Sequence, residues 1–211
     1  MIKVHILFKF TSGAFGGGNQ FLKALRDYFR EKDVYVENPE DADVILFNSN
    51  RSSLRTLRKK LYYLKFKKNK ILTNRVDGPF SKREKKNYIR DVFVIKINDI
   101  FMDGIIYQSN WSFEGMNNIK QLRKPVTVIH NAPDNEIFYP PQKKKTDGER
   151  IRLIANSWSI SHNVKGFDTY KFLDNNLDFS KYEMTFVGRS PIEFKNINYL
   201  EPVESKKMAD I

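Results

Sequence analysis

Residues 1–30 read MIKVHILFKF TSGAFGGGNQ FLKALRDYFR, and the pattern of apolar residues changes within them. From Ile2 to Phe10 apolar and polar residues largely alternate, which is typical of a half-buried strand. A glycine run from Gly16 to Gly18 follows. Beyond it, apolar residues recur at the spacing of one helix face: Phe21, Leu22, Leu25, Tyr28 and Phe29. A strand, a glycine turn and a helix in this order predict the start of an α/β sheet.

The same alternation of elements continues along the chain. Short apolar runs predict strands at 34–36, 44–47, 71–73, 104–108 and 126–130. Helical or mixed segments separate the later strands, and one of these spans 112–122. Strands that alternate with helices predict a parallel sheet covered on both faces, so we expect an α/β fold for residues 1–138.

A second unit is expected after a linker at 139–150, where paired prolines, a lysine run and Gly148 follow one another. Strands are predicted at 151–156, 183–187 and 196–200, and a helix at 167–177. A unit of this size buries only about 60% of the surface of its unfolded chain. We therefore expect residues 151–211 to form an incomplete lobe, and the chain by itself to bind its substrate weakly.

Composition excludes several classes of protein. The 211 residues include no cysteine, which excludes a disulfide scaffold, thiol catalysis and a zinc knuckle. The 17 Phe and 10 Tyr residues argue against disorder. Because the sequence has neither an apolar leader nor an apolar run long enough to span a bilayer, we expect a cytoplasmic protein.

The net charge of +12 lies within residues 1–150. The stretch from Arg51 to Lys70 holds nine Lys or Arg and no acidic residue, with leucines at helical spacing. This predicts a basic amphipathic helix. One interpretation is contact with an anionic membrane or with nucleic-acid phosphates, where each basic residue contributes about 1 kcal/mol near a lipid surface. An ordinary solvated helix face is the equally weighted alternative.

Polar residues follow several predicted strands of the first unit. The glycine run 16–18 is neither a dinucleotide fingerprint nor a P-loop, but free N–H groups at a helix start attract anions, and a plain turn is the alternative. Arg75 and Asp77 follow the strand at 71–73, where either could face a ligand; otherwise Asp77 caps the turn and Arg75 lies on the surface. His130 is interpreted as part of a strand exit more than as a catalytic base. The three histidines fit no metal motif.

Two strand ends of the second unit also carry polar groups. Lys165 and Gly166 stand at a predicted helix start, where a lysine opposes the helix dipole unless an anion such as a diphosphate lies between them. An exposed lysine beside a required glycine is the alternative. Gly188 and Arg189 repeat the pattern after the next strand.

Taken together, these segments resemble the glycosyltransferase family 4 enzymes of the two-lobed GT-B fold. The resemblance rests on the glycine loop at 16–18, on Asp103 to Ser112, on the run VIHNAPDNEIFYP at 128–140, on Lys165-Gly166-Phe167 and on Phe186-Val187-Gly188. Ala132 departs from the glycine usual in that family. Trp158, Ser159 and Ile160 occupy the neighbourhood of the family's donor-binding arginine, and its two-glutamate motif would lie beyond Ile211.

The resemblance implies a complete acceptor lobe, an incomplete donor lobe, and retaining transfer of a sugar from a nucleotide-sugar to a glycan or lipid-linked acceptor in polysaccharide biosynthesis. It implies no metal and no cofactor beyond the nucleotide-sugar. The donor-binding residues that it implies are Gly17, Gly18, Ser159, Lys165, Gly166, Gly188 and Arg189. The interlobe residues are His130, Asn131 and Asp134, and Arg75 and Asp77 are the catalytic candidates.

The stretch from Arg51 to Lys70 would then hold the enzyme at the inner face of a membrane. A different class of function stays open, in which the chain is a non-catalytic basic module that binds nucleic acid or an anionic membrane. Recognisable nucleic-acid-binding motifs are lacking, so a nucleic-acid partner is the weaker expectation.

Overall fold

The computed structural model describes residues 1–12, 17–48, 54–82, 87–140, 149–160 and 165–211, with side chains within helix α2 described from Leu57 onward. Two compact units make up the chain: Met1–Phe10 with Gly17–Ala132 forms the core of the first, and Pro133–Ile211 forms that of the second. Gly16, Arg51 to Ser53 and most of the predicted linker lie outside the described residues.

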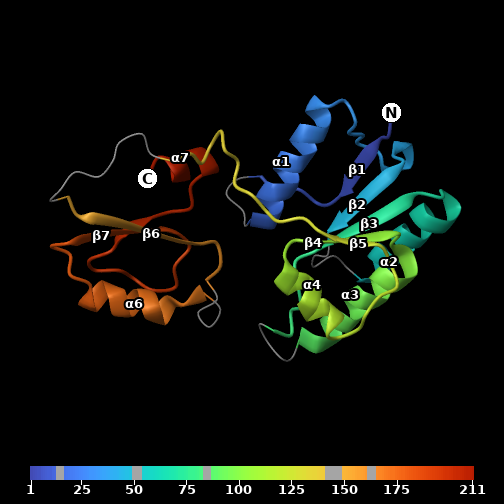
Figure 1. Cartoon of the computed structure of the whole chain (residues 1–211). Helices are drawn as coiled ribbons and strands as arrows, with labels where there is room; N and C mark the ends of the chain where they lie inside the picture. Colours follow the sequence, from blue (N-terminus) through green and yellow to red (C-terminus); the bar gives the residue numbers. More distant parts are fainter. Residues whose placement is uncertain (13–16, 49–53, 83–86, 141–148, 161–164) are drawn as a thin grey trace. The chain divides into compact units, whose positions relative to one another are not determined.

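The first unit is built on five parallel strands in the order β1-β2-β3-β4-β5 (Figure 1). Their bounds are β1 (Val4–Leu7), β2 (Val44–Asn48), β3 (Ile71–Val76), β4 (Gly104–Tyr107) and β5 (Val126–Val128). Every neighbouring pair is parallel. The parallel sheet predicted from the alternation of elements is confirmed, and all its carboxyl ends lie at one edge.

Helices cover both faces of this sheet, as predicted (Figure 1). The helical elements are α1 (Gly17–Glu31), η1 (Pro39–Asp41), α2 (Leu54–Tyr62), its π-helical continuation η2 (Tyr63–Lys67), α3 (Tyr88–Phe101) and α4 (Asn110–Asn117). On one face Leu22 of α1 packs against Ile6 and Leu46. On the other face α2, η2 and α3 pack against β2 and β3, and α4 packs against β4.

Two predicted strands differ from the structure. The first strand ends at Leu7 and not at Phe10, because the N–H of Phe8 bonds back to the carbonyl of Ile6 at 2.9 Å and turns the chain. The strand predicted at 34–36 is reduced to an isolated bridge between Tyr35 and Val4. Only three helical residues, those of η1, then lead from this bridge to β2. The described residues between this bridge and β2 therefore form no α-helix.

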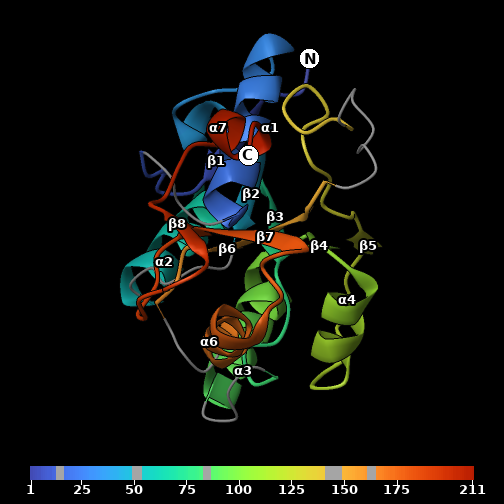
Figure 2. The same cartoon turned by 90° about the vertical axis from the view of Figure 1, so that its left-hand side faces the viewer.

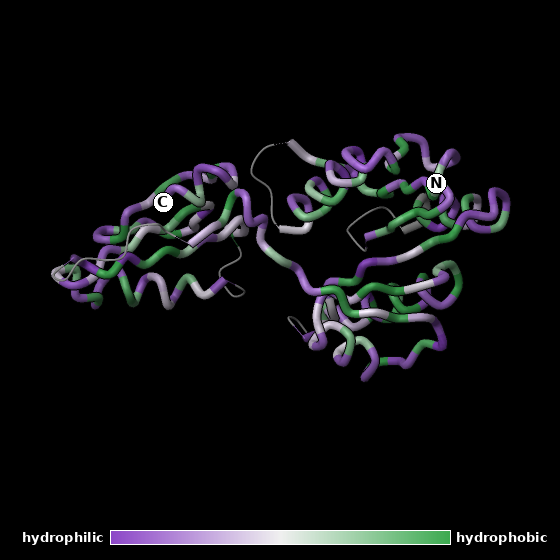
Figure 3. Tube along the Cα trace, turned by 45° about the horizontal axis from the view of Figure 1, so that its top comes forward, coloured by the Kyte–Doolittle hydropathy of each residue, from purple (hydrophilic) through white to green (hydrophobic). Residues whose placement is uncertain are grey.

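The second unit has a three-stranded parallel sheet in the order β6-β7-β8 (Figure 2). Its elements are β6 (Ile151–Ser157), α6 (Phe167–Asn176), β7 (Tyr182–Gly188), β8 (Asn198–Leu200) and α7 (Ser205–Ala209). Phe167 at the start of α6 is fully buried against Met184, Phe186 and Ile197. Figure 3 shows hydrophobic stretches interspersed with hydrophilic ones along the chain in both units.

Candidate functional site

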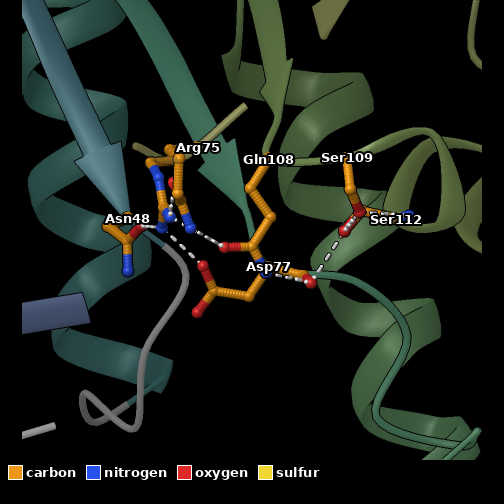
Figure 4. Close-up of polar contacts among 7 residues, drawn as sticks. Asn48, Arg75, Asp77, Gln108, Ser109 and Ser112 are labelled. Carbon is orange, nitrogen blue, oxygen red and sulfur yellow. Dashed lines mark hydrogen bonds and ion pairs between the residues drawn. The ribbon is translucent and has the colours of Figure 1, made fainter. Parts of the chain in front are cut away.

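Polar side chains meet at the carboxyl edge of the first sheet (Figure 4). Asn48 ends β2, Arg75 lies next to the last residue of β3, Gln108 follows β4 and Asn131 comes after β5. Their convergence follows from the topology, since parallel neighbours place their carboxyl ends side by side. Ligands of open α/β sheets bind at this edge.

Arg75 is the centre of this cluster and is almost fully buried, with 4% of its side chain exposed. Its Nη1 donates to Asn48 Oδ1 at 3.1 Å and to Asp77 Oδ1. Its Nη2 donates to Gln108 Oε1 at 2.8 Å and to Asn131 Oδ1 at 3.0 Å. A buried guanidinium is tolerated only when its donors are paired, so these acceptors hold Arg75 in one position.

An aromatic ring covers the same guanidinium. The ring centroid of Phe21, on α1, lies 4.4 Å from Arg75 Cζ, a cation–π contact. Arg75 therefore joins three strands of the sheet to the helix that starts after the glycine run.

Asp77 presents a half-exposed carboxylate beside this cation, with 36% of its side chain accessible. Its backbone carbonyl accepts hydrogen bonds from Gln108 Nε2 at 2.7 Å and from Ser112 Oγ at 2.9 Å. Figure 4 shows the carboxylate directed toward the Arg75 guanidinium. One oxygen is bound to Arg75, and the carboxylate is placed to contact a ligand at the sheet edge.

The turn after Asp77 is rigid. Gly78 has φ +123°, and a Cβ there would lie 2.7 Å from the ring of Trp111, so only glycine fits. The buried carboxylate of Asp91 accepts the backbone N–H groups of Phe80 at 2.7 Å and Ser81 at 2.8 Å. Both ends of the turn are thus fixed, which pre-organises Asp77.

The sequence predicted Arg75 and Asp77 as candidates but not their surroundings. Its alternative of a surface Arg75 is wrong, because the side chain is buried. Asn48 and Gln108 were missed as members of the cluster. The available signal was a polar residue directly after an apolar strand segment, as in Val44–Asn48.

In the second unit, Lys165 and Gly166 stand at the start of α6. Gly166 has the left-handed φ of +67° and is the N-cap, and its carbonyl accepts the N–H of Thr169 at 3.0 Å. Lys165 is exposed immediately before it. This is a helix N-terminus with an adjacent ammonium group, an arrangement suited to an anion.

Ser159, Gly188 and Arg189 are brought together by Ser157. The Arg189 N–H donates to the Ser157 carbonyl at 2.7 Å, and the Ser159 N–H bonds to Ser157 Oγ at 3.3 Å. A Cβ on Gly188 would lie 2.1 Å from the same carbonyl oxygen, and its φ is +129°. Glycine is therefore required where β6 and β7 end side by side.

The remaining predicted residues have different surroundings. Gly17 and Gly18 form the first turn of α1, and an added Cβ would meet nothing within 4 Å at either position. Of the predicted interlobe residues only Asn131 joins the Arg75 cluster; His130 is exposed. Asp134 stabilises a local turn through the N–H of Glu136 at 3.0 Å.

Within the described residues no cluster of three or more His, Cys, Asp or Glu side chains could hold a metal ion. The described helices include none with the length and apolar character needed to span a membrane.

Comparison with known proteins gives a likeness of fold. No protein-family model and no curated protein matches the sequence. The structure is similar to that of HepE from Anabaena in complex with UDP and glucose, with a TM-score of 0.64 and 12% identity over 97% of this chain and 70% of HepE. HepE in complex with UDP-glucose gives a TM-score of 0.64 and 14% identity over the same shares.

The fold is of the GT-B glycosyltransferase type. The predicted fold class is confirmed by this likeness and by the two parallel sheets. At 12 to 14% identity this likeness shows the fold alone, so an activity has to be inferred from the residues of the site.

Proposed function

We propose that this protein is a retaining glycosyltransferase of family 4 that moves a sugar from a nucleotide-sugar to a glycan or lipid-linked acceptor. The observation that carries the proposal is the half-exposed Asp77 carboxylate, held in a rigid turn at the carboxyl edge of a GT-B-type sheet. The likeness to HepE, which was determined with UDP-glucose, supports a nucleotide-sugar as donor.

The reaction develops two opposite charges, and different groups must stabilise each of them. Breaking the bond between the anomeric carbon and the diphosphate oxygen leaves positive charge on the sugar and negative charge on the diphosphate. We assign stabilisation of the sugar to the Asp77 carboxylate, which Arg75 and Gln108 orient. The acceptor hydroxyl bonds to the anomeric carbon and gives its proton to the leaving diphosphate.

We assign stabilisation of the negative charge to donors of the second unit. Lys165 and the N-terminus of α6 would bind the diphosphate, together with the backbone at Ser159, Gly188 and Arg189. Gly17 and Gly18 are the donor-site candidates of the first unit, where the open space around their α-carbons would let a ligand approach α1 closely. The proposal includes no metal ion, because Lys165 takes the role of neutralising the leaving group.

Binding of the nucleotide-sugar tests the assignment of Lys165 to the diphosphate. Saturation-transfer NMR with UDP-glucose should show weak binding to the 211-residue chain, and Lys165→Ala should reduce the transferred saturation several-fold. Lys171→Ala, on the same helix, is the matched control and should leave it unchanged. Equal saturation in both variants, or none in the parent chain, would refute the assignment of Lys165.

Transfer of labelled sugar tests Asp77. In protein isolated from its native cell, Asp77→Asn should lower the turnover number at least 100-fold, about 2.7 kcal/mol of transition-state stabilisation, with little change in KM. Asp99→Asn, a surface carboxylate paired with Lys120, is the control. A turnover number within threefold of the parent would contradict a catalytic role.

A surface on α2 and η2 supports contact with an anionic membrane as part of the same function. This basic aromatic surface consists of five exposed residues: Arg58, Lys59, Tyr62, Phe66 and Lys67. Tyr62 and Phe66 lie 5.1 Å apart between ring centroids. Aromatic rings flanked by lysines suit the boundary between lipid headgroups and acyl chains. By contrast, Lys65 and Lys68 are paired with Asp103 and Glu40.

This surface would hold the protein at the inner face of a membrane. Vesicle flotation should show binding to phosphatidylserine vesicles that weakens steeply with salt and is lost in Lys59→Glu with Lys67→Glu. Lys206→Glu with Lys207→Glu, on α7, is the control for net charge. If the parent instead binds duplex DNA more tightly than vesicles, the alternative of a nucleic-acid-binding module is favoured.

A further inference from the structure

A pocket of about 850 Å³ lies along β1 in the first unit. His5 and Leu7 of β1, Tyr35, Phe47 of β2, and Leu57 and Lys60 of α2 line it. The bridge at Tyr35 is joined to β2 through η1 alone, so the residues that the structure describes between this bridge and β2 place no α-helix beside α2. Its volume is in the range of small-molecule sites.

Part of the pocket wall is apolar. Leu7, Phe47 and Leu57 belong to a single hydrophobic cluster, and Phe8 and Phe10 continue the wall past the end of β1. An occupant therefore needs a hydrocarbon portion to remove this surface from water.

Positive charge also lines the pocket. Lys60 and Lys9 both line the pocket and are exposed. Glu37 also lines it, but its carboxylate is paired with Arg30, which offsets its negative charge. The occupant that complements these two lysines is an anion.

His5 adds a hydrogen-bond acceptor. Its Nδ1 lies 3.0 Å from the carbonyl oxygen of Val36, so Nδ1 holds the ring proton and Nε2 has the lone pair. Burial, reinforced by the charge of Lys60, lowers the pKa of His5 although the bond to Val36 opposes this. Tyr35 stacks on the ring at 6.0 Å and holds it in place. In the neutral ring, Nε2 is therefore a hydrogen-bond acceptor among the residues that line the pocket.

We propose that this pocket binds a lipid phosphate ester, with the phosphate at Lys60 and Lys9 and the first carbons of the chain against Leu7, Phe47 and Leu57. Bare phosphate would leave the apolar wall hydrated, and a neutral lipid would leave both ammonium groups unpaired. Another face of α2 carries the basic aromatic surface, so a lipid that leaves a bilayer there meets the pocket on the same helix. The proposal does not depend on sugar transfer.

The test uses decyl phosphate below its micelle concentration as the probe. The chain has three histidines, so the ring signals of His5 can be followed by NMR during titration. Decyl phosphate should shift them and bind at least tenfold more tightly than inorganic phosphate or decyl maltoside. Lys60→Gln should weaken binding at least fivefold, and Lys59→Gln, its neighbour on the exposed face, should not.

The results of these titrations distinguish a lipid phosphate from a bare anion and from an uncharged apolar ligand. Equal affinity for inorganic phosphate identifies a bare anion site and overturns the proposal. Equal affinity for decyl maltoside, with no effect of Lys60→Gln, identifies an apolar pocket without anion recognition and also overturns it. A shift of the His5 signals with phosphatidic acid vesicles identifies a bilayer phospholipid as the source, and a shift with the soluble probe alone identifies a single delivered lipid. Loss of UDP-glucose binding has no bearing on these results.

Discussion

The amide oxygen of Gln108 accepts a hydrogen bond from Nη2 of the buried Arg75 at 2.8 Å. The same oxygen accepts Asn131 Nδ2 at 2.9 Å, and Gln108 Nε2 donates to the Asp77 carbonyl at 2.7 Å. One side chain thus links the ends of β3 and β4, the segment after β5 and the turn that carries Asp77.

Replacing Arg75 should destabilise the first unit. Arg75→Met leaves the amide oxygens of Asn48, Gln108 and Asn131 without their cationic donor, at an expected cost of about 3 kcal/mol. Denaturant unfolding followed by Trp111 fluorescence in a Trp158→Phe background measures it. Arg123→Met, at an exposed position, should change the free energy of unfolding by less than about 0.5 kcal/mol. Equal stability of the two variants would show that the cluster does not hold the sheet edge.

Glycines at two positions of the first unit should respond oppositely to alanine. Gly78→Ala places a methyl group 2.7 Å from Trp111 at φ +123°, and should cost about 2 kcal/mol or more. Gly18→Ala meets open space in the first turn of α1, and should leave stability unchanged or raise it by up to about 1 kcal/mol.

The affinity of Gly18→Ala for UDP-glucose tests whether Gly18 belongs to the donor site. If the donor approaches the backbone of α1, the variant should bind at least fivefold more weakly while remaining fully folded. Unchanged affinity measured by saturation-transfer NMR would remove Gly18 from the donor site.

Gly188→Ala should prevent the second unit from folding. A Cβ at 2.1 Å from the Ser157 carbonyl cannot be accommodated without separating β6 from β7. Circular dichroism and Trp158 fluorescence should show loss of its transition. Gly166→Ala, where the nearest atom would be 3.9 Å away at φ +67°, should cost only about 1 to 2 kcal/mol.

The second unit should also lose stability in acid through Asp174. Burial alone would raise the pKa of this carboxyl, but hydrogen bonds from the N–H groups of Lys195, Asn196 and Ile197 lower the pKa below its ordinary value. Because the folded state favours the carboxylate, its stabilisation is complete above the unfolded pKa of about 3.9 and is lost as pH falls through the lowered folded pKa.

Asp174→Asn should therefore be less stable than the parent by about 2 kcal/mol at pH 7. The gap should shrink as pH falls below about 4. Thermal unfolding across this range, followed by Trp158, measures it. Asp168→Asn, an exposed residue on the same helix, controls for the change in charge. A gap that stays constant with pH would show that ionisation of Asp174 does not stabilise the fold.

Local periodicity in the sequence was enough to predict strands alternating with helices and the parallel arrangement, because burial of one face imposes a period on each element. The segment that becomes α3 was not separated as a helix, since apolar residues such as Ile89, Val94 and Ile100 lie on several of its sides and blur the period. Arg75, Asp77 and Gly188 stood out as polar or glycine residues directly after apolar runs.

Tertiary structure alone decided what these residues contact. Asn48, Arg75, Gln108 and Asn131 are far apart in sequence, and the order of the strands brings them together. The burial of Arg75, the contact of Gly78 with Trp111 and the pocket beside β1 likewise depend on which elements become neighbours. Periodicity reports which side of an element is buried, whereas a site depends on distances between elements, and those exist only once the chain has folded.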